Sequence, residues 1–74
     1  MPRKVRELRA ELGRDGFVLE RGRGKGSHTV WSHPLYPGHV TLSGQDGDDA
    51  QPYQEKQVRN AIRMVREAQR RRKP

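Results

Sequence analysis

The chain of 74 residues contains no cysteine, carries a net charge of +7 and has an isoelectric point near 10.8. This length fits one small domain, and the absence of cysteine excludes disulfides, thiolate zinc sites and cysteine nucleophiles. The longest apolar run, residues 17–19, is too short for a membrane span or a signal-peptide core. We therefore expect a cytoplasmic protein with no membrane segment, whose positive charge favours a polyanionic partner, most often nucleic acid.

A first helix is predicted from the spacing of three apolar residues. Val5, Leu8 and Leu12 recur at intervals of three and four, which places them on one helical face. Charged side chains fill the other positions between them. We expect this helix to cover residues 3–14. Gly13 or Gly16 can end it, and Gly16 is the more natural C-terminal cap, because glycine accepts the left-handed conformation that often follows a helix.

Three strands are expected after this helix. Residues 17–21 and 28–33 are rich in apolar and β-branched side chains, and a basic glycine loop at 22–27 separates them. Pro34 ends the second strand, since proline has no N–H to donate to a sheet. Residues 39–43 alternate polar and apolar side chains, as a half-buried strand does.

A polar loop at 44–51 precedes the second predicted helix. Pro52 suits the first turn of a helix, and apolar residues then follow at helical spacing: Val58, Ala61, Ile62, Val65 and Ala68. The basic residues near the end are expected to fray into solvent. We therefore expect a single domain over residues 1–69 and a basic tail over 70–74.

The order of elements predicts an α+β fold of the type helix–strand–strand–strand–helix. Short connections between consecutive strands favour a three-stranded antiparallel sheet with both helices on one face. Alternation along the strands then divides the side chains between the two faces of the sheet. The residues expected to face the helices are Phe17, Leu19, Trp31, Val40 and Leu42. Those expected on the opposite face are His28, Val30, Ser32, His39 and Thr41.

His28 is the strongest candidate for a catalytic residue. It follows a loop whose glycines allow backbone N–H groups to approach a phosphate closely, and imidazole gains and loses protons near neutral pH. Together with cations, it could cleave RNA without a metal by activating the ribose 2′-hydroxyl. The phosphate-binding residues would be Arg21, Arg23, Lys25, Gly26 and Ser27. The sequence offers His39 or Lys25 as the second proton carrier and does not choose between them.

The other polar clusters favour structural roles. His33 precedes Pro34 at a strand end, where a turn residue bonded to backbone is the simpler interpretation. Asp46, Asp48 and Asp49 are more typical of a solvated turn before a helix than of a metal site. The glycine loop lacks the Gly-Lys-Ser/Thr order of a nucleotide-binding loop, because Gly26 separates the lysine from the serine. We therefore expect neither a metal ion nor another cofactor.

Several motifs in order resemble one known family. The tripeptide at 26–28, Trp31, the His-Pro pair at 33–34, the Gly-Phe pair at 16–17 and the stretch 47–59 are similar to the HicA (YcfA-like) family of mRNA interferase toxins. The resemblance runs from about residue 5 to 67. Where many members carry a Pro-x-His motif after the third strand, this chain has Ser-Gly-Gln-Asp.

This resemblance implies a double-stranded-RNA-binding-like fold and ribonuclease activity on mRNA, with His28 essential. It also implies a HicB-type antitoxin that blocks the active face and represses the shared operon. Two other functions fit the charge and the fold. One is a non-catalytic RNA-binding module, and the other is a domain that mainly binds a protein partner.

Overall fold

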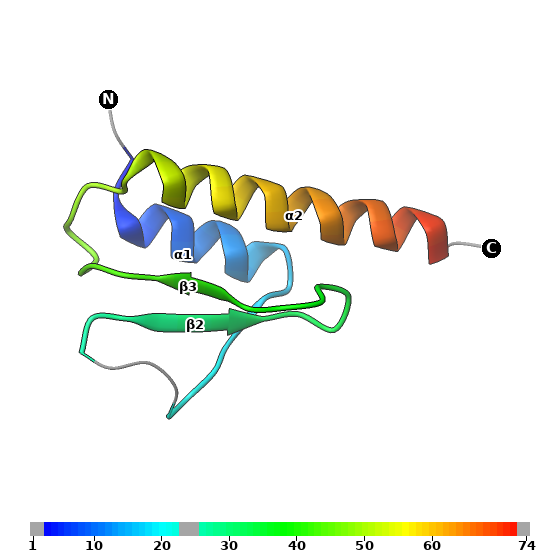
Figure 1. The fold of residues 1–74 in the computed structure, drawn as a ribbon, viewed down its shortest axis with the longest axis horizontal. Coiled ribbons are helices and arrows are strands. Elements are labelled where there is room, and N and C mark those ends of the chain that lie inside the picture. Colours follow the sequence, from blue (N-terminus) through cyan, green and yellow to red (C-terminus); the bar gives the residue numbers. More distant parts are fainter. Residues whose placement is uncertain (1–2, 23–25, 73–74) are drawn as a thin grey trace.

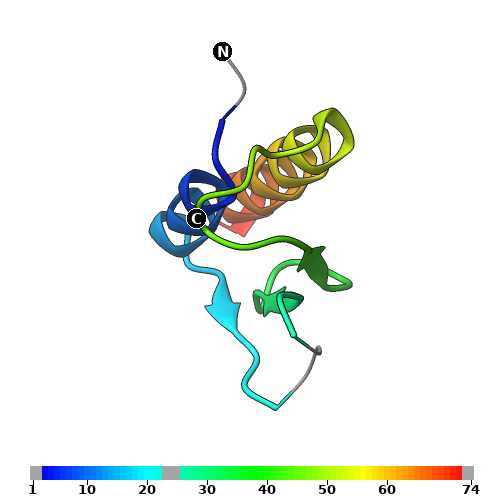
Figure 2. The same ribbon diagram turned by 90° about the vertical axis from the view of Figure 1, so that its left-hand side faces the viewer.

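The computed structural model describes residues 3–22 and 26–72. Its elements are α1 (Val5–Arg14), β1 (Val18–Leu19), β2 (Thr29–Ser32), β3 (Val40–Leu42) and α2 (Pro52–Arg72). The strands form an antiparallel sheet in the order β1-β2-β3. Both helices cover one face of that sheet, and none of the described helices lies on the other face (Figure 1 and Figure 2). The α+β architecture predicted from the sequence is confirmed.

The first helix begins two residues later than predicted, because the backbone of Lys4 is extended. The carbonyl of Arg3 accepts a hydrogen bond from Ala50 N–H at 2.6 Å, and Lys4 forms an antiparallel bridge with Asp49. Lys4 N–H then donates to Glu7 Oε2 at 2.6 Å. This contact satisfies a backbone donor at the start of the helix.

Gly16 follows α1 with φ of +92°, a left-handed conformation that side chains other than glycine rarely adopt. Phe17 N–H donates to the carbonyl of Leu12 at 3.0 Å across this turn. A Cβ atom on Gly16 would lie 3.1 Å from His33 Nε2. Both the backbone conformation and the neighbouring imidazole therefore require glycine, as the sequence predicted for the end of the helix.

The core lies between the helices and the sheet. All the apolar residues predicted from helical spacing are buried except Ala68, which is half-buried. The buried ones are Val5, Leu8, Leu12, Val58, Ala61, Ile62 and Val65, and the core also contains Phe17, Val40, Leu42 and Ala50. Trp31 is partly buried against this cluster. Helical periodicity and strand alternation thus identified nearly all of the core.

Leu19 lies on the helix-facing side of the sheet, as predicted, but it is not buried. Leu19 pairs with Trp31 and so shares the helix-facing side, yet it is 42% exposed, and Val18 is 60% exposed. β1 is only two residues long and has a neighbouring strand on one side only. An outer strand this short leaves its side chains near the rim of the core, where packing is incomplete.

The predicted basic tail is helical for most of its length, because α2 continues through Arg72. Glutamate, glutamine and arginine are strong helix formers, and arginines in the last turn interact favourably with the negative end of the helix dipole. Residues 73 and 74 lie outside the described part. Among the described residues, no helix is both long and apolar enough to cross a membrane.

Candidate functional site

His28 directly precedes β2 and is exposed. The register pairs Thr29 with Leu42, so the next position along the two strands places Ser43 beside His28. Because side chains alternate along a strand, His28 shares a face with Val30 and Ser32. This is the face of the sheet that the helices leave uncovered.

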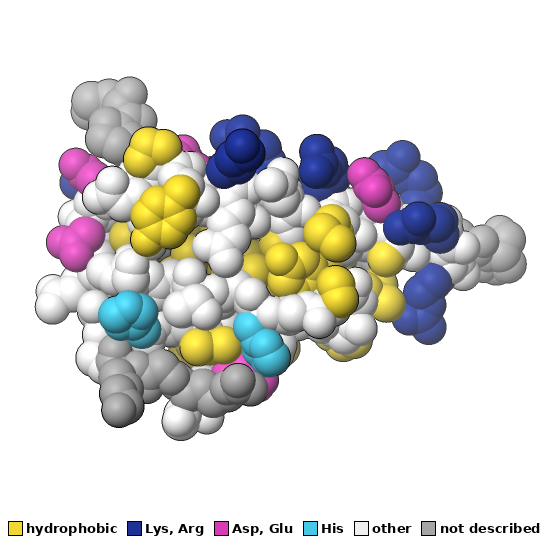
Figure 3. Space-filling model, in the orientation of Figure 1, with side chains coloured by type: hydrophobic (Ala, Val, Ile, Leu, Met, Phe, Trp, Pro, Cys, Tyr) yellow, Lys and Arg dark blue, Asp and Glu magenta, His cyan; other side chains and the backbone are white. Residues whose placement is uncertain are grey.

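We call this surface the outer face and define it by His28, Val30, Ser32, His39 and Thr41. The register pairs Val30 with Thr41, and the adjacent position pairs Ser32 with His39. Figure 3 shows histidine side chains at the surface on the side of the molecule where the strands lie. The outer face therefore carries two histidines, as the sequence predicted.

His28 and His39 lie at different positions along the strands of the outer face. His39 directly precedes Val40, which pairs with Trp31, so continuing the register places His39 opposite Ser32, four residues along the chain from His28. At 3.3–3.4 Å per residue, the two histidines are separated by about 13 Å of strand. The backbone positions of the two histidines are therefore well separated along the strand, whereas a group that transfers a proton must lie within hydrogen-bond reach of the reacting atom.

His39 is instead paired with Glu20. Its Nε2 lies 3.6 Å from Glu20 Oε1, and both side chains are partly exposed. Glu20 N–H donates to the carbonyl of Val30 at 2.8 Å, so Glu20 sits on the β1 side of β2 while His39 sits on the β3 side. The pair therefore spans β2 on the outer face. It helps explain why Val30, which we expected to be exposed there, is only 8% exposed.

His33 is held by contacts that suit a structural role. Its Nδ1 accepts a hydrogen bond from Leu35 N–H at 3.0 Å, and its carbonyl accepts one from Tyr36 N–H at 3.0 Å. Its ring packs on Phe17 with 5.1 Å between ring centroids. These contacts agree with the sequence-based interpretation of His33 as a turn residue.

Gly26 and Ser27 line a concavity of about 520 Å³ at the start of β2. The other lining residues are Arg9, Thr29, Gln45 and Asp46. Gly26 has φ of +60°, which glycine adopts without strain. Two of the predicted phosphate-binding residues thus meet α1 and the loop after β3 in one hollow.

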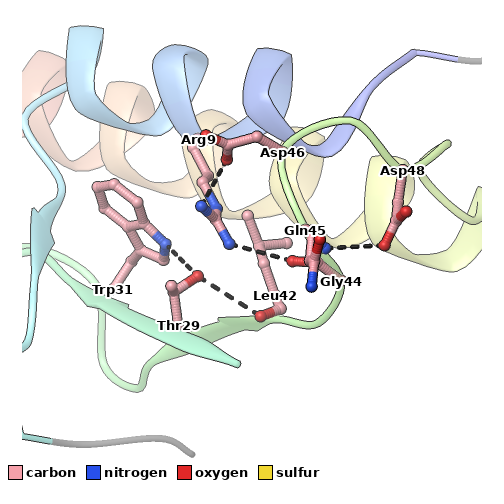
Figure 4. Close-up of polar contacts among 8 residues, drawn as sticks. All are labelled: Arg9, Thr29, Trp31, Leu42, Gly44, Gln45, Asp46 and Asp48. Carbon is pink, nitrogen blue, oxygen red and sulfur yellow. Dashed lines mark hydrogen bonds and ion pairs between the residues drawn. The ribbon is translucent and has the colours of Figure 1, made fainter. Parts of the chain in front are cut away.

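Arg9 is a residue of this hollow that the sequence did not reveal. Its Nη1 donates to Asp46 Oδ1 and its Nη2 donates to the carbonyl of Gly44 at 3.1 Å (Figure 4). Its Nε is buried, with no hydrogen-bond partner in the described ranges. Both partners are more than 30 residues away in the chain, so no local pattern could have identified this contact.

The aspartates of the loop after β3 each bind a different part of the chain. Asp46 binds Arg9, Asp49 accepts from Lys4 Nζ at 2.6 Å, and Asp48 accepts from Gln45 N–H at 2.8 Å. Within residues 3–22 and 26–72, no three acidic, histidine or cysteine side chains are grouped as a metal site would need. The loop after β3 therefore contacts α1 through Asp46, the residue before α1 through Asp49, and its own backbone through Asp48.

Gln54 is a second residue that the sequence did not single out. It is 2% exposed. Its Nε2 donates to the carbonyl of Ser43 at 2.9 Å, and its Oε1 accepts from Gln51 N–H at 2.9 Å. Since Ser43 lies beside His28, Gln54 fixes the backbone next to the candidate catalytic residue from the first turn of α2.

The predicted cations are only partly within the described structure. Arg21 lies in the turn after β1 and is exposed. Arg23 and Lys25 lie outside the described residues.

A comparison with protein families decides what this domain is. Residues 5–68 match the sequence model described as the HicA toxin of bacterial toxin–antitoxin systems. The chain belongs to the HicA toxin family. The match spans nearly all of the domain, and it confirms the resemblance seen in the motifs around His28. No curated protein and no solved structure matches the chain. Membership in the HicA family implies a toxin role and a cognate antitoxin as partner.

Proposed function

We propose that this HicA protein is an endoribonuclease that cleaves mRNA without a metal ion and thereby inhibits translation in the cytoplasm. The observation that carries the proposal is the position of His28. It presents an exposed imidazole on the outer face, directly after Gly26 and Ser27, in a chain of net charge +7. Imidazole transfers protons near neutral pH, and the excess of cations favours a polyanionic substrate.

The reaction would use the ribose 2′-hydroxyl as nucleophile. A base removes its proton, the oxygen forms a bond to the adjacent phosphorus, and the bond from phosphorus to the 5′-oxygen breaks as that oxygen gains a proton. The products are a 2′,3′-cyclic phosphate and a 5′-hydroxyl. Arg21, Arg23 and the backbone N–H groups of Gly26 and Ser27 would stabilise the charge that develops on the phosphorus oxygens.

In this proposal His28 carries one proton transfer and Lys25 carries the other. Of the two second carriers that the sequence offered, His39 points toward Glu20 and lies about 13 Å of strand away from His28. Lys25 precedes His28 by three residues and belongs to the basic loop. A HicB-type antitoxin would inhibit the toxin by covering the outer face.

A cleavage assay in chelator tests this proposal. Purified protein is incubated in excess EDTA with a labelled single-stranded RNA, and with DNA of the same sequence. We expect cleavage of the RNA alone, with 2′,3′-cyclic phosphate ends. Cleavage of DNA, or cleavage that requires added divalent metal, contradicts the mechanism. Salt-sensitive RNA binding without cleavage would instead support the non-catalytic RNA-binding module.

A further inference from the structure

A row of arginines follows one side of α2, away from the outer face. Arg59, Arg63, Arg66 and Arg70 are spaced by four, three and four residues, which places them on one side of a helix. They line a groove of about 400 Å³ between α1 and α2, together with Glu11, Ile62 and Glu67. Figure 3 shows lysine and arginine side chains along α2, apart from the histidines on the strands.

Within the described part of the chain, most of these arginines have no ion-pair partner. Arg66 pairs with Asp15 at 3.0 Å, but Arg59, Arg63 and Arg70 form no ion pair with the described residues 3–22 and 26–72. The contrast with the start of the chain is clear, because Arg3, Lys4 and Arg9 are paired with acidic side chains. The net charge of the domain is therefore concentrated on α2.

The acidic residues of the groove do not cancel this charge. Glu11 is already paired with Arg3, whose pKa is raised chiefly by the hydrogen bond that it donates to Glu11. Glu67 is then the one remaining carboxylate among the described lining residues. Three uncompensated arginines against one carboxylate leave the groove positive.

The geometry of the row suits a nucleic-acid strand. From Arg59 to Arg70 the helix rises about 16 Å, at 1.5 Å per residue, and neighbouring arginines are about 5–6 Å apart. A row of cations at this spacing can follow successive phosphates. A peptide helix in the groove would need apolar anchors, but Ile62, which is 6% exposed, is the one apolar side chain among the described lining residues.

We infer that the groove lined by Arg59, Arg63 and Arg70 is a second binding surface for the phosphate backbone of single-stranded RNA. This inference rests on RNA being the ligand of the proposed function, but it concerns a surface distinct from His28. A strand that contacts both surfaces must pass around the edge of the domain. The groove would hold the RNA while His28 acts on another part of it.

The test compares two triple variants that remove the same charge. Both are made in the His28→Ala background so that the RNA stays intact. The groove variant carries Arg59→Gln, Arg63→Gln and Arg70→Gln, and the control carries Arg6→Gln, Lys56→Gln and Arg72→Gln, which are exposed and outside the groove lining. Binding of a labelled single-stranded RNA is measured by fluorescence anisotropy at several salt concentrations. Circular dichroism checks that both variants are folded.

We expect the groove variant to reduce the slope of log affinity against log salt by about 2, since each phosphate contact to a single strand contributes about 0.7. Its affinity should fall on the order of tenfold, and the control should lose much less. A variant with lysines at the three groove positions should keep the slope, because it keeps the charges. Equal losses in the groove and control variants, or an unchanged slope in both, would overturn the inference.

The outcome is separable from that of the proposed function. Steep, groove-dependent binding by a protein that never cuts RNA would support the groove and reject the nuclease. Cleavage that depends on His28, with RNA binding that does not depend on the groove, would support the nuclease and reject the groove as an RNA-binding surface.

Discussion

His28 and His39 lie on the same face of the sheet but at opposite ends of β2, with His39 directed toward Glu20. From the sequence, His39 was one candidate for a second proton-transferring imidazole beside His28. The strand register places these two histidines at different positions along the sheet. The Nδ1 atom of His33 accepts a hydrogen bond from Leu35 N–H in the turn before β3. The proposed chemistry therefore depends on His28 together with the basic loop that precedes it.

Replacement of Gly16 by alanine should destabilise the domain. The substitution places a side chain in a left-handed conformation, which costs about 1–2 kcal/mol, and brings its Cβ 3.1 Å from His33 Nε2. Chemical denaturation would measure the free energy of unfolding. The matched control is Gly13→Ala, because Gly13 lies in α1 with nothing within 4 Å of its added Cβ. That control should be neutral or stabilising by about 0.5–1 kcal/mol, and equal losses in the two variants would contradict this account of the turn.

Gln54→Ala should lower the free energy of unfolding by about 1–3 kcal/mol. The substitution leaves the carbonyl of Ser43 and the N–H of Gln51 without the side-chain partner that they have now. Thermal or urea unfolding would measure the loss. Gln57→Ala, on the same helix with a half-buried side chain, should change stability by less than about 0.5 kcal/mol. If the two variants were equally stable, the hydrogen bond from Gln54 to the carbonyl of Ser43, just after β3, would not contribute to stability.

Val30 and Val18 provide a test of how the outer face is covered. Val30 is 8% exposed and Val18 is 60% exposed, although both lie in strands of the same sheet. Val30→Thr should cost about 1–3 kcal/mol, because it buries a hydroxyl, whereas Val18→Thr should stay within about 0.5 kcal/mol of the original. Urea unfolding of both variants checks this. A Val30→Thr protein as stable as the Val18→Thr protein would show that the outer face over β2 is open to water.

The parts of the fold that were predictable from sequence are those set by local periodicity. The positions of Val5, Leu8 and Leu12 follow from helical spacing, and those of Val40 and Leu42 follow from strand alternation. Both patterns depend on the geometry of a few consecutive residues. The same alternation places His28 outward, so the candidate catalytic residue could be oriented before the structure was known.

The parts that were not predictable depend on contacts between distant segments. Arg9 is fixed by Asp46 and by the carbonyl of Gly44, and Gln54 is fixed by Ser43. Leu19 was expected to face the helices, and it does, but its burial depends on how far the helices extend over an outer strand. A pattern of neighbouring residues in the sequence does not specify these long-range contacts or the extent of this burial.

The most direct test of the central claim is the rate of RNA cleavage in EDTA by three proteins: the original chain, His28→Ala and His39→Ala. His39 is the matched control, since it is also an exposed histidine on the outer face. We expect His28→Ala to lose on the order of 10²–10⁴-fold in rate while it still binds RNA, and His39→Ala to cleave at close to the original rate. A His28→Ala protein that cleaves as fast as the original chain, or a His39→Ala protein that loses as much, would contradict the assignment of His28 as the proton-transferring residue.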